Sequence, residues 1–172
     1  SSSAAFNAPV VGKQRTKNKE FSVDSFSWSP DGMRIAFSAT INPDLIQGTT
    51  ADVYVLDLGA DTVRKIVSQP GPDTGPRWSP DGKQIVFSSA MGREPFFATN
   101  TRLAIVPAEG GTPKSIPKSI TDTFDENANL LEWKQDGIYF NAQQKTASHL
   151  FRLDPTTGTV VQRPFYRKFD PS

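Results

Sequence analysis

The chain carries the pentapeptide Trp-Ser-Pro-Asp-Gly twice, at residues 28–32 and 78–82, and a degenerate copy, Trp-Lys-Gln-Asp-Gly, at residues 133–137. The tryptophans of successive copies are 50 and 55 positions apart. Self-similarity at a period of this size predicts a repeat architecture, in which each unit buries its apolar face only against its neighbours. This repeat constrains the fold more than any other feature of the sequence.

The motif has the composition of a tight turn between two strands. Proline at the second turn position fixes φ near −65°, aspartate can bond back to its own backbone, and glycine tolerates the exit conformation. Apolar residues alternate with polar ones on both sides of the first copy, at Phe26 and Trp28 before it and at Ile35 and Phe37 after it. Each copy is therefore predicted to be the tip of an antiparallel hairpin.

A second pair of strands is predicted after each hairpin. These strands are expected at residues 53–58 and 63–67, at 103–106 and 113–116, and at 150–154 and 159–161. Four strands per unit, at a period slightly above the roughly 40 to 45 residues of a propeller blade, predict an all-β fold: a partial β-propeller of about three four-stranded antiparallel blades. The expected division is a lead-in or remnant of a preceding blade at 1–20, blades at about 21–70, 71–120 and 121–165, and a tail or next blade at 166–172.

Nine residues occupy equivalent positions in the three copies, and we interpret them as structural. The tryptophans are expected to pack between adjacent blades, with their indole N–H groups bonded to neighbouring acceptors. The aspartates and glycines are expected to form the turns. The residues are Trp28, Asp31 and Gly32; Trp78, Asp81 and Gly82; and Trp133, Asp136 and Gly137.

Two turn-rich insertions interrupt the first two units at the same point, at residues 40–50 and 90–100. Insertions at equivalent points of successive repeats fall on one face of the array, which is often the binding face. In the second insertion, the Glu94 carboxylate could meet a substrate ammonium group, and Phe96 and Phe97 could meet an apolar side chain. The alternatives are a solvated glutamate and an apolar core local to the loop. These three are the candidate substrate-binding residues.

Composition narrows the class of protein without naming a partner. With 36% hydrophobic residues, 22% charged residues and a net charge of +1, the chain gives no indication of disorder, a membrane span or a nucleic-acid surface. The basic cluster at residues 13–19 is interpreted as a solvated segment, with a patch for an anionic partner as the alternative. The sequence has no cysteine, so it forms no disulfide.

Together, these motifs resemble the propeller repeat of periplasmic Tol-type proteins and of prolyl oligopeptidase family serine peptidases. The resemblance rests on the repeated Trp-Ser-Pro-Asp-Gly with its Ile-x-Phe strand, and on the patterns at residues 52–58, 71–82 and 148–154. The last three are most similar to the dipeptidyl peptidase or acylaminoacyl peptidase branch. The resemblance covers residues from about 21 to 165.

The peptidase resemblance implies a two-part enzyme, in which a propeller gates and positions short peptides for an α/β-hydrolase domain. Partners outside this chain would then be the missing blades, the C-terminal hydrolase domain and a peptide substrate. A closed propeller needs about four to eight blades, so two copies pairing as a homodimer is a further expectation. Relatives of this type are often exported, which favours a periplasmic or secreted location. The alternative is a non-enzymatic Tol-type propeller that binds protein or glycan.

The sequence itself holds no catalytic constellation. The nucleophile elbow Gly-x-Ser-x-Gly is absent, and His149, the sole histidine, is interpreted as an ordinary strand residue rather than a catalytic base. The acidic group at residues 122–127 lacks the glycine and the distal glutamate of a calcium hand, so a polar loop is favoured over calcium binding. No cofactor or metal is expected, and catalysis is assigned to residues outside the chain.

Overall fold

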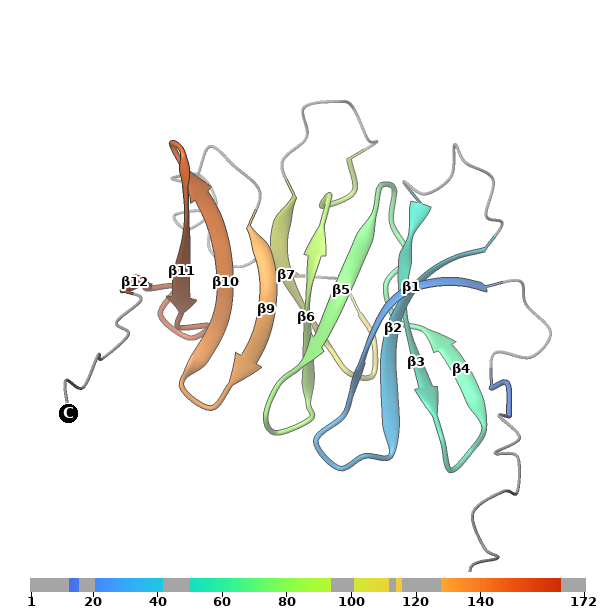
Figure 1. The fold of residues 1–172 in the computed structure, drawn as a ribbon. Coiled ribbons are helices and arrows are strands. Elements are labelled where there is room, and N and C mark those ends of the chain that lie inside the picture. Colours follow the sequence, from blue (N-terminus) through green and yellow to red (C-terminus); the bar gives the residue numbers. More distant parts are fainter. Residues whose placement is uncertain are drawn as a thin grey trace, which may run out of the picture.

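A computed structural model of the chain describes residues 13–15, 21–41, 50–93, 101–111, 114–115 and 128–164. These residues contain twelve β-strands, which form three separate four-stranded sheets (Figure 1). Each sheet uses four strands that are consecutive in sequence and pair antiparallel, and we call the sheets blades 1, 2 and 3. The prediction of an all-β partial propeller with three four-stranded antiparallel blades is confirmed.

The blades have the same internal order, with the first strand at one edge and the fourth at the other. Blade 1 contains β1 (Phe21–Trp28), β2 (Arg34–Ile41), β3 (Asp52–Asp57) and β4 (Thr62–Lys65). Blade 2 contains β5 (Asp73–Trp78), β6 (Gln84–Ser89), β7 (Arg102–Pro107) and β8 (Lys114–Ser115). Blade 3 contains β9 (Asn129–Lys134), β10 (Gly137–Gln144), β11 (Ala147–Leu153) and β12 (Val160–Arg163). The second strand pair of each blade lies where the sequence predicts it, with ends shifted by a few residues.

Blade 2 lies between the other two blades. Its first strand β5 contacts β1, β2 and β3 of blade 1, and β5 and β6 contact β9 of blade 3 (Figure 1). The alternation of side chains along each strand gives every sheet two faces. Blade 2 is therefore the only described blade that has a described neighbour on both faces.

Two apolar clusters fill the spaces between the blades. The cluster between blades 1 and 2 combines Val53 and Val55 with Trp78, Ile85 and Phe87. The cluster between blades 2 and 3 combines Val86 and Leu103 with Ile138, Phe140 and Leu153. Ile85 and Val86 are neighbours in β6 and enter different clusters, as the two-residue period of a strand requires. Successive residues of one strand thus hold two different neighbouring blades.

The connections separate the two ends of the blades. The short turns β1–β2, β5–β6 and β9–β10, which contain the repeated motif, lie at the lower end in Figure 1, which we call the turn end. The β2–β3 and β6–β7 connections, where the sequence places the insertions, leave from the opposite end, which we call the insertion end. The repeat motif and the predicted substrate-binding insertions therefore belong to opposite ends of the blades.

The described part of the basic lead-in pairs with blade 1. Lys13 and Arg15 lie 3.6 Å and 3.1 Å from the carboxylate oxygens of Asp61, in the β3–β4 turn. All three side chains are well exposed, so these ion pairs contribute little to stability. Among the described residues, no helix is long and apolar enough to cross a membrane.

Candidate functional site

The three predicted substrate-binding residues, Glu94, Phe96 and Phe97, lie outside the described residues. So does the acidic group at residues 122–127, and the described part of the chain contains no cluster of three or more His, Cys, Asp or Glu side chains that could hold a metal. The structure describes the strands on either side of the insertions and the junction between blades 1 and 2.

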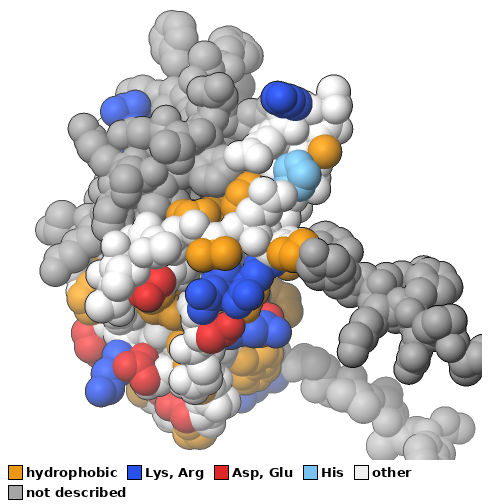
Figure 2. All heavy atoms as spheres, turned by 90° about the vertical axis from the view of Figure 1, so that its left-hand side faces the viewer, with side chains coloured by type: hydrophobic (Ala, Val, Ile, Leu, Met, Phe, Trp, Pro, Cys, Tyr) orange, Lys and Arg blue, Asp and Glu red, His pale blue; other side chains and the backbone are white. Residues whose placement is uncertain are grey.

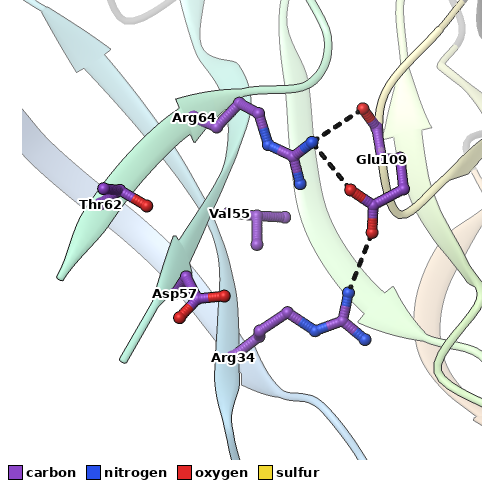
Figure 3. A pocket seen from close by; sticks show the side chains of 6 residues that line it. All are labelled: Arg34, Val55, Asp57, Thr62, Arg64 and Glu109. Carbon is purple, nitrogen blue, oxygen red and sulfur yellow. Dashed lines mark hydrogen bonds and ion pairs between the residues drawn. The ribbon is translucent and has the colours of Figure 1, made fainter. Parts of the chain in front are cut away.

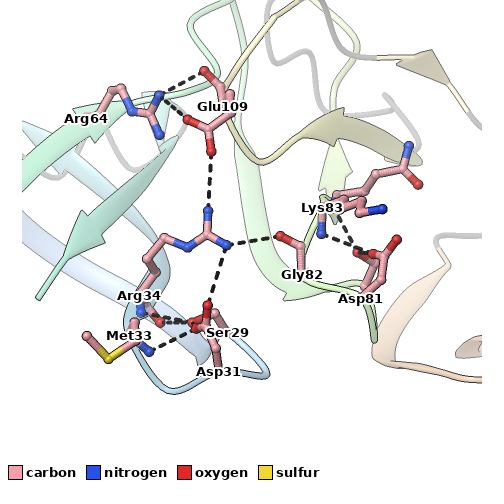
Figure 4. Close-up of polar contacts among 11 residues, drawn as sticks. Ser29, Asp31, Met33, Arg34, Arg64, Asp81, Gly82, Lys83 and Glu109 are labelled. Atoms are coloured by element: carbon pink, nitrogen blue, oxygen red, sulfur yellow. Dashed lines mark hydrogen bonds and ion pairs between the residues drawn. The ribbon is translucent and has the colours of Figure 1, made fainter. Parts of the chain in front are cut away.

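The first two motif turns share most of their hydrogen bonds (Figure 4). The Ser29 hydroxyl donates to Asp31 Oδ1 at 2.5 Å, and the Ser79 hydroxyl donates to Asp81 Oδ1 at 2.6 Å. Each serine oxygen also accepts the backbone N–H five residues later at 2.9 Å. The hydroxyl of each serine is the main group that holds the pKa of its aspartate below the ordinary value. These aspartates are ionised turn residues at neutral pH.

The third turn is tighter than the first two and is held by other contacts. Its ladder continues to the pair Lys134–Gly137, whereas the pairs nearest the first two turns are Trp28–Ile35 and Trp78–Ile85. Asp136 accepts a hydrogen bond from the Tyr139 hydroxyl at 2.7 Å, and this bond is the main cause that lowers its pKa. Arg152 donates to the Asp136 backbone carbonyl at 2.7 Å and lies 3.9 Å from its carboxylate. Tyr139, three residues further along the same hairpin, and Arg152 on β11 therefore supply the stabilisation that serine supplies in the first two turns.

Trp78 is held between blades 1 and 2 by two groups of blade 1. Its side chain is 5% exposed, and its indole N–H donates to the Ser27 carbonyl at 3.1 Å. The Arg34 guanidinium lies over the ring, 4.7 Å from the centroid, which is within the range of a cation–π contact. Arg34 also donates to the Gly82 carbonyl at 3.2 Å, so one side chain contacts both the ring and the turn that follows it (Figure 4).

Glu109 links strands β2 and β4 of blade 1 to blade 2. Its carboxylate lies 3.4 Å from Arg34 and 2.9 Å from Arg64, and its backbone carbonyl accepts a further bond from Arg64 at 3.1 Å (Figure 3). These three side chains, with Val55, Asp57 and Thr62, line a cavity of about 180 Å³. Two cations and two carboxylates balance each other there, so the cavity has no excess charge to attract an ion. We interpret the ion pairs of Glu109 with the two arginines as a structural contact that holds blades 1 and 2 together.

Trp28 and Trp133 have different surroundings from Trp78. Trp28 is 55% exposed, and among the described residues no acceptor for its indole N–H is found. Trp133 is partly buried against the cluster between blades 2 and 3. All three rings, with Arg77 and Glu132, border a cleft of about 230 Å³ at the turn end. The sequence predicts placement between two blades for all three tryptophans; of these, Trp78 is the one that is buried and bonded to the preceding described blade.

The outer face of blade 3 differs from the equivalent face of blade 2. The cross-strand pair Val86–Ile105 faces blade 3 and is apolar, whereas the equivalent pair in blade 3 is Tyr139–Arg152. Figure 2 looks onto this side of the molecule, where basic and acidic side chains lie next to each other. The Asp136 carboxylate lies 3.9 Å from both Arg152 and Arg163. At this position the outer face of blade 3 is therefore polar, where that of blade 2 is apolar.

Catalytic chemistry has no support in the described residues. His149 lies on β11 with its ring 6.4 Å from that of Phe151, and the Gln162 amide lies 3.0 Å from its Nδ1 atom. Among the described residues the His149 ring has neither a serine hydroxyl nor a carboxylate as a hydrogen-bond partner, so this part of the chain brings no nucleophile and base together.

Sequence reasoning missed the residues that join the blades. Arg34, Arg64 and Glu109 are charged residues of strands and turns, which periodicity alone interprets as solvent-facing. One signal was available for Arg34, because the second copy has Gln84 at the equivalent position and the two copies are otherwise nearly identical. Asp73, which is buried at the insertion end, enters the sequence analysis only within the pattern at residues 71–82, which assigns it no role of its own.

Residues 10–160 match the model of the TolB beta propeller domain (PD40), and the chain belongs to this family. The chain is 31% identical over 145 residues to dipeptidyl-peptidase 5 of Porphyromonas gingivalis, a match that covers 81% of the chain and 20% of that protein. The chain thus spans about a fifth of the length of this curated relative.

Solved structures agree on the fold. TolB from Acinetobacter baumannii superposes with a TM-score of 0.61 at 20% identity, covering 83% of this chain and 32% of TolB. The β-propeller domain of the Trilobed protease from Pyrococcus furiosus gives a TM-score of 0.57 at 19% identity, covering 86% of this chain and 45% of that domain. At these identities the likeness establishes the propeller fold and leaves the function open.

Proposed function

We propose that the chain is the non-catalytic propeller part of a prolyl oligopeptidase family serine peptidase. In this role it gates short peptides and positions them for a hydrolase domain encoded outside residues 1–172. The observation that carries the proposal is the 31% identity to a stretch of dipeptidyl-peptidase 5, against 20% to TolB of A. baumannii. The division into a lead-in at 1–20, three blades between about 21 and 165, and a tail at 166–172 is part of the proposal.

The separation of the two ends supports a gating role. The turn end is fixed by repeated local bonds and by the Arg34–Trp78 junction. The insertion end carries the two connections that interrupt the repeat, and binding residues concentrate in loops that a rigid scaffold positions. A propeller of this kind would vary its substrate preference at the insertion end without altering its junctions.

The test of the peptidase assignment is the reading frame on both sides of residues 1–172. We expect a downstream Gly-x-Ser-x-Gly followed by Asp and His, since the hydrolase fold places its triad in that order. A fluorophosphonate probe should label the parent protein and leave the 172-residue chain unlabelled. A reading frame that ends in further blades, with no hydrolase domain, would refute the peptidase assignment.

The candidate substrate residues are tested in the parent enzyme. Glu94→Gln removes the carboxylate charge at nearly constant volume, so we expect the KM for peptides with a free amino terminus to rise about tenfold or more. Peptides with a blocked terminus should be unaffected. The Phe96→Ala and Phe97→Ala variants should weaken peptides with apolar side chains. The matched control is Glu109→Gln, a carboxylate at the junction between blades; equal effects of both variants would argue against a role for Glu94.

The second candidate function is a non-enzymatic Tol-type propeller that binds protein or glycan. The TM-score of 0.61 to TolB and the TolB domain match favour it. Under this reading the parent protein would contain blades without a hydrolase domain. Binding partners would then be recovered from periplasmic extract by the wild-type chain and lost when the β2–β3 and β6–β7 insertions are replaced by short turns.

The ring must be completed by other blades, because a propeller closes with about four to eight. The exposed Trp28 marks the side of blade 1 where a preceding blade would cover it. Our proposal assigns the missing blades to the parent protein, while a homodimer of two such chains would supply about six or seven blades. Light scattering at micromolar concentration distinguishes these cases, since a monomeric mass excludes the homodimer.

A further inference from the structure

Asp73 is a buried carboxylate that no role described so far explains. It is the first residue of β5, at the insertion end, and its side chain is 0% exposed. Its Oδ1 atom accepts a hydrogen bond from the Gln69 amide at 2.9 Å, whereas its Oδ2 atom is buried without a hydrogen-bond partner. An ionised carboxylate normally has several acceptor sites occupied, so a buried oxygen that lacks a partner is costly.

Asp73 connects the bases of both insertions. Its backbone N–H donates to the Ala51 carbonyl at 2.7 Å, directly before β3, where the chain returns from the first insertion. Across the sheet it pairs with Ser89, the last residue of β6, where the second insertion begins. The Gln69 amide bonds to the Ser89 hydroxyl at 2.9 Å as well as to Asp73. Asp73 therefore lies where the ends of the two connections come together.

Ser89 links this hydrogen-bonded group to the start of the second insertion. Its hydroxyl oxygen accepts the Met91 N–H at 2.8 Å, and Met91 has a φ of +54°, a left-handed conformation that is unfavourable for a side chain of this kind. The turn packs closely on Gly71, where an added Cβ would lie 2.2 Å from the Arg93 carbonyl oxygen. The turn can hold this strained shape only while its hydrogen bonds remain intact.

We propose that Asp73 is a positioning residue whose proton determines how firmly the bases of both insertions are held to blade 2. When Asp73 is neutral, no charge is buried and the network around Gln69 and Ser89 is stable. When Asp73 loses its proton, a full charge with one unpartnered oxygen lies between the two connections, and this end of the blade opens more easily. The anchoring is a property of this chain; its consequence for peptide selection rests on the proposed gating function.

The charged surroundings are consistent with this behaviour. Burial raises the pKa of Asp73 to about 6, while the neighbouring Ser89 hydroxyl and the Gln69 amide lower it in part and the negative charge of Asp52 raises it. Asp52 on β3 is itself paired with Lys65 on β4, at 2.5 Å. Two further described charges lie close to this point: Arg102 on β7, which pairs with Ser89 across the sheet, and Arg93, whose side chain is exposed. No described cation compensates Asp73 directly.

The sign of the pH effect follows from the raised pKa. Because the carboxyl binds its proton more tightly in the folded chain, the stabilisation is fully present below the ordinary value of 3.8 and is lost as the pH rises through about 6. The insertion end should therefore be held more firmly under mildly acidic conditions than at neutral pH. The exposed turn aspartates have lowered pKa values and depend on pH in the opposite direction.

Hydrogen exchange on the 172-residue chain tests this inference without any peptidase activity. The informative amides are those of Asp73, Ala90, Met91 and Arg93, whose bonds join this region. After correction for intrinsic exchange rates, we expect their opening equilibrium to increase about tenfold from pH 5 to pH 7.5. In Asp73→Asn it should stay constant over this range, whereas the control Asp81→Asn should retain the increase.

Two results would overturn the proposal: a wild-type opening equilibrium that does not change with pH, or an increase that survives in Asp73→Asn. If Asp73→Asn does not fold, a carboxyl carbon NMR titration of the wild-type chain decides. A midpoint near 6 supports the proposal, and a midpoint near 4 refutes it. Because these measurements involve no substrate, failure here would leave the proposed gating function standing, and failure of the peptidase assignment would leave this result unaffected.

Discussion

Trp28 and Trp78 begin two identical pentapeptides, yet 55% of the Trp28 side chain is exposed and 5% of the Trp78 side chain is. The turns that follow them share the bond between serine and aspartate, whose length agrees to within 0.1 Å, and the bonds from the backbone N–H groups to these two side chains. Their strands also pair in the same way, since Trp28 lies opposite Ile35 and Trp78 lies opposite Ile85. Local sequence has therefore produced the same local structure twice.

The difference arises from the neighbouring blade. Blade 1 supplies the Ser27 carbonyl and the Arg34 guanidinium that hold Trp78, and no described blade does this for Trp28. In a repeat protein, stability is the sum of what each unit contributes and what each junction contributes. The two tryptophans separate these contributions within one chain. The turn is stabilised by contacts inside its own blade, whereas burial of the ring depends on the contact with the neighbouring blade.

The largest expected effect is the difference between the two tryptophan deletions. Trp78→Ala leaves a cavity between blades 1 and 2 and should lower the free energy of unfolding by about 3–5 kcal/mol. Trp28→Ala removes a ring that is mostly exposed and should cost less than about 1 kcal/mol. Urea denaturation of both variants measures the difference. If both substitutions lowered the free energy of unfolding equally, Trp28 would have to be buried in solution, which would contradict the difference in exposure between the two tryptophans.

The Arg34 guanidinium, which lies over the Trp78 ring, should account for part of the difference in stability between the two tryptophan variants. Arg34→Gln places in blade 1 the residue that blade 2 has at the equivalent position, Gln84, and removes the cation from the Trp78 ring. We expect a loss of about 1–2 kcal/mol from the cation–π contact and the bond to the Gly82 carbonyl. Lys83→Gln removes a nearby exposed charge and is the control. If Arg34→Gln loses no more stability than Lys83→Gln, Arg34 does not stabilise the junction between blades 1 and 2.

The turns should respond equally, in contrast to the tryptophans. Gly32 and Gly82 have φ values of +69° and +68°, where a Cβ strains the backbone of any L-residue. Gly32→Ala and Gly82→Ala should each cost about 1–2 kcal/mol, with nearly the same value in both copies. Thermal unfolding of the two variants is sufficient. Markedly unequal values would show that the junction, and not the unit alone, determines turn stability.

The smallest expected effect is electrostatic and is likewise the same in both copies. Ser29→Ala and Ser79→Ala remove the hydroxyl that chiefly lowers the pKa of Asp31 and Asp81, so each pKa should rise towards its ordinary value. The stabilisation from the lowered pKa is present above that ordinary value and is lost as the pH falls through the pKa of the folded chain. Carboxyl NMR titration should give matching shifts. A shift in only one copy would contradict the equivalence of the turns.

Much of the fold could be predicted because its determinants are local. Proline, aspartate and glycine at fixed turn positions define the hairpin tips, and alternation around residues such as Phe37 and Phe87 defines the strands. The register shift of β5 between Thr74 and Arg77 could not be predicted in this way. It leaves no sign in the alternation of a strand that contains Gly75 and Pro76.

The site was harder to predict because its determinants are distant in sequence. Arg34 acts on a ring 44 positions away, and Glu109 bridges two arginines that belong to another blade. Asp73 follows Gly71 and Pro72 and looks like a turn residue, whereas its burial depends on Ala51 and Ser89. Glu94, Phe96 and Phe97 remain predictions that the experiments in the parent enzyme address.

Each blade is made from one uninterrupted stretch of chain, and among the described strands none is shared between sheets. A duplication or deletion in the coding sequence that starts and ends between blades would add or remove a complete sheet and leave every other hydrogen-bonded ladder intact. Only the junction residues, such as the ring at position 78 and the guanidinium at position 34, would have to be selected anew. In such a lineage the number of blades can change faster than the architecture of any blade.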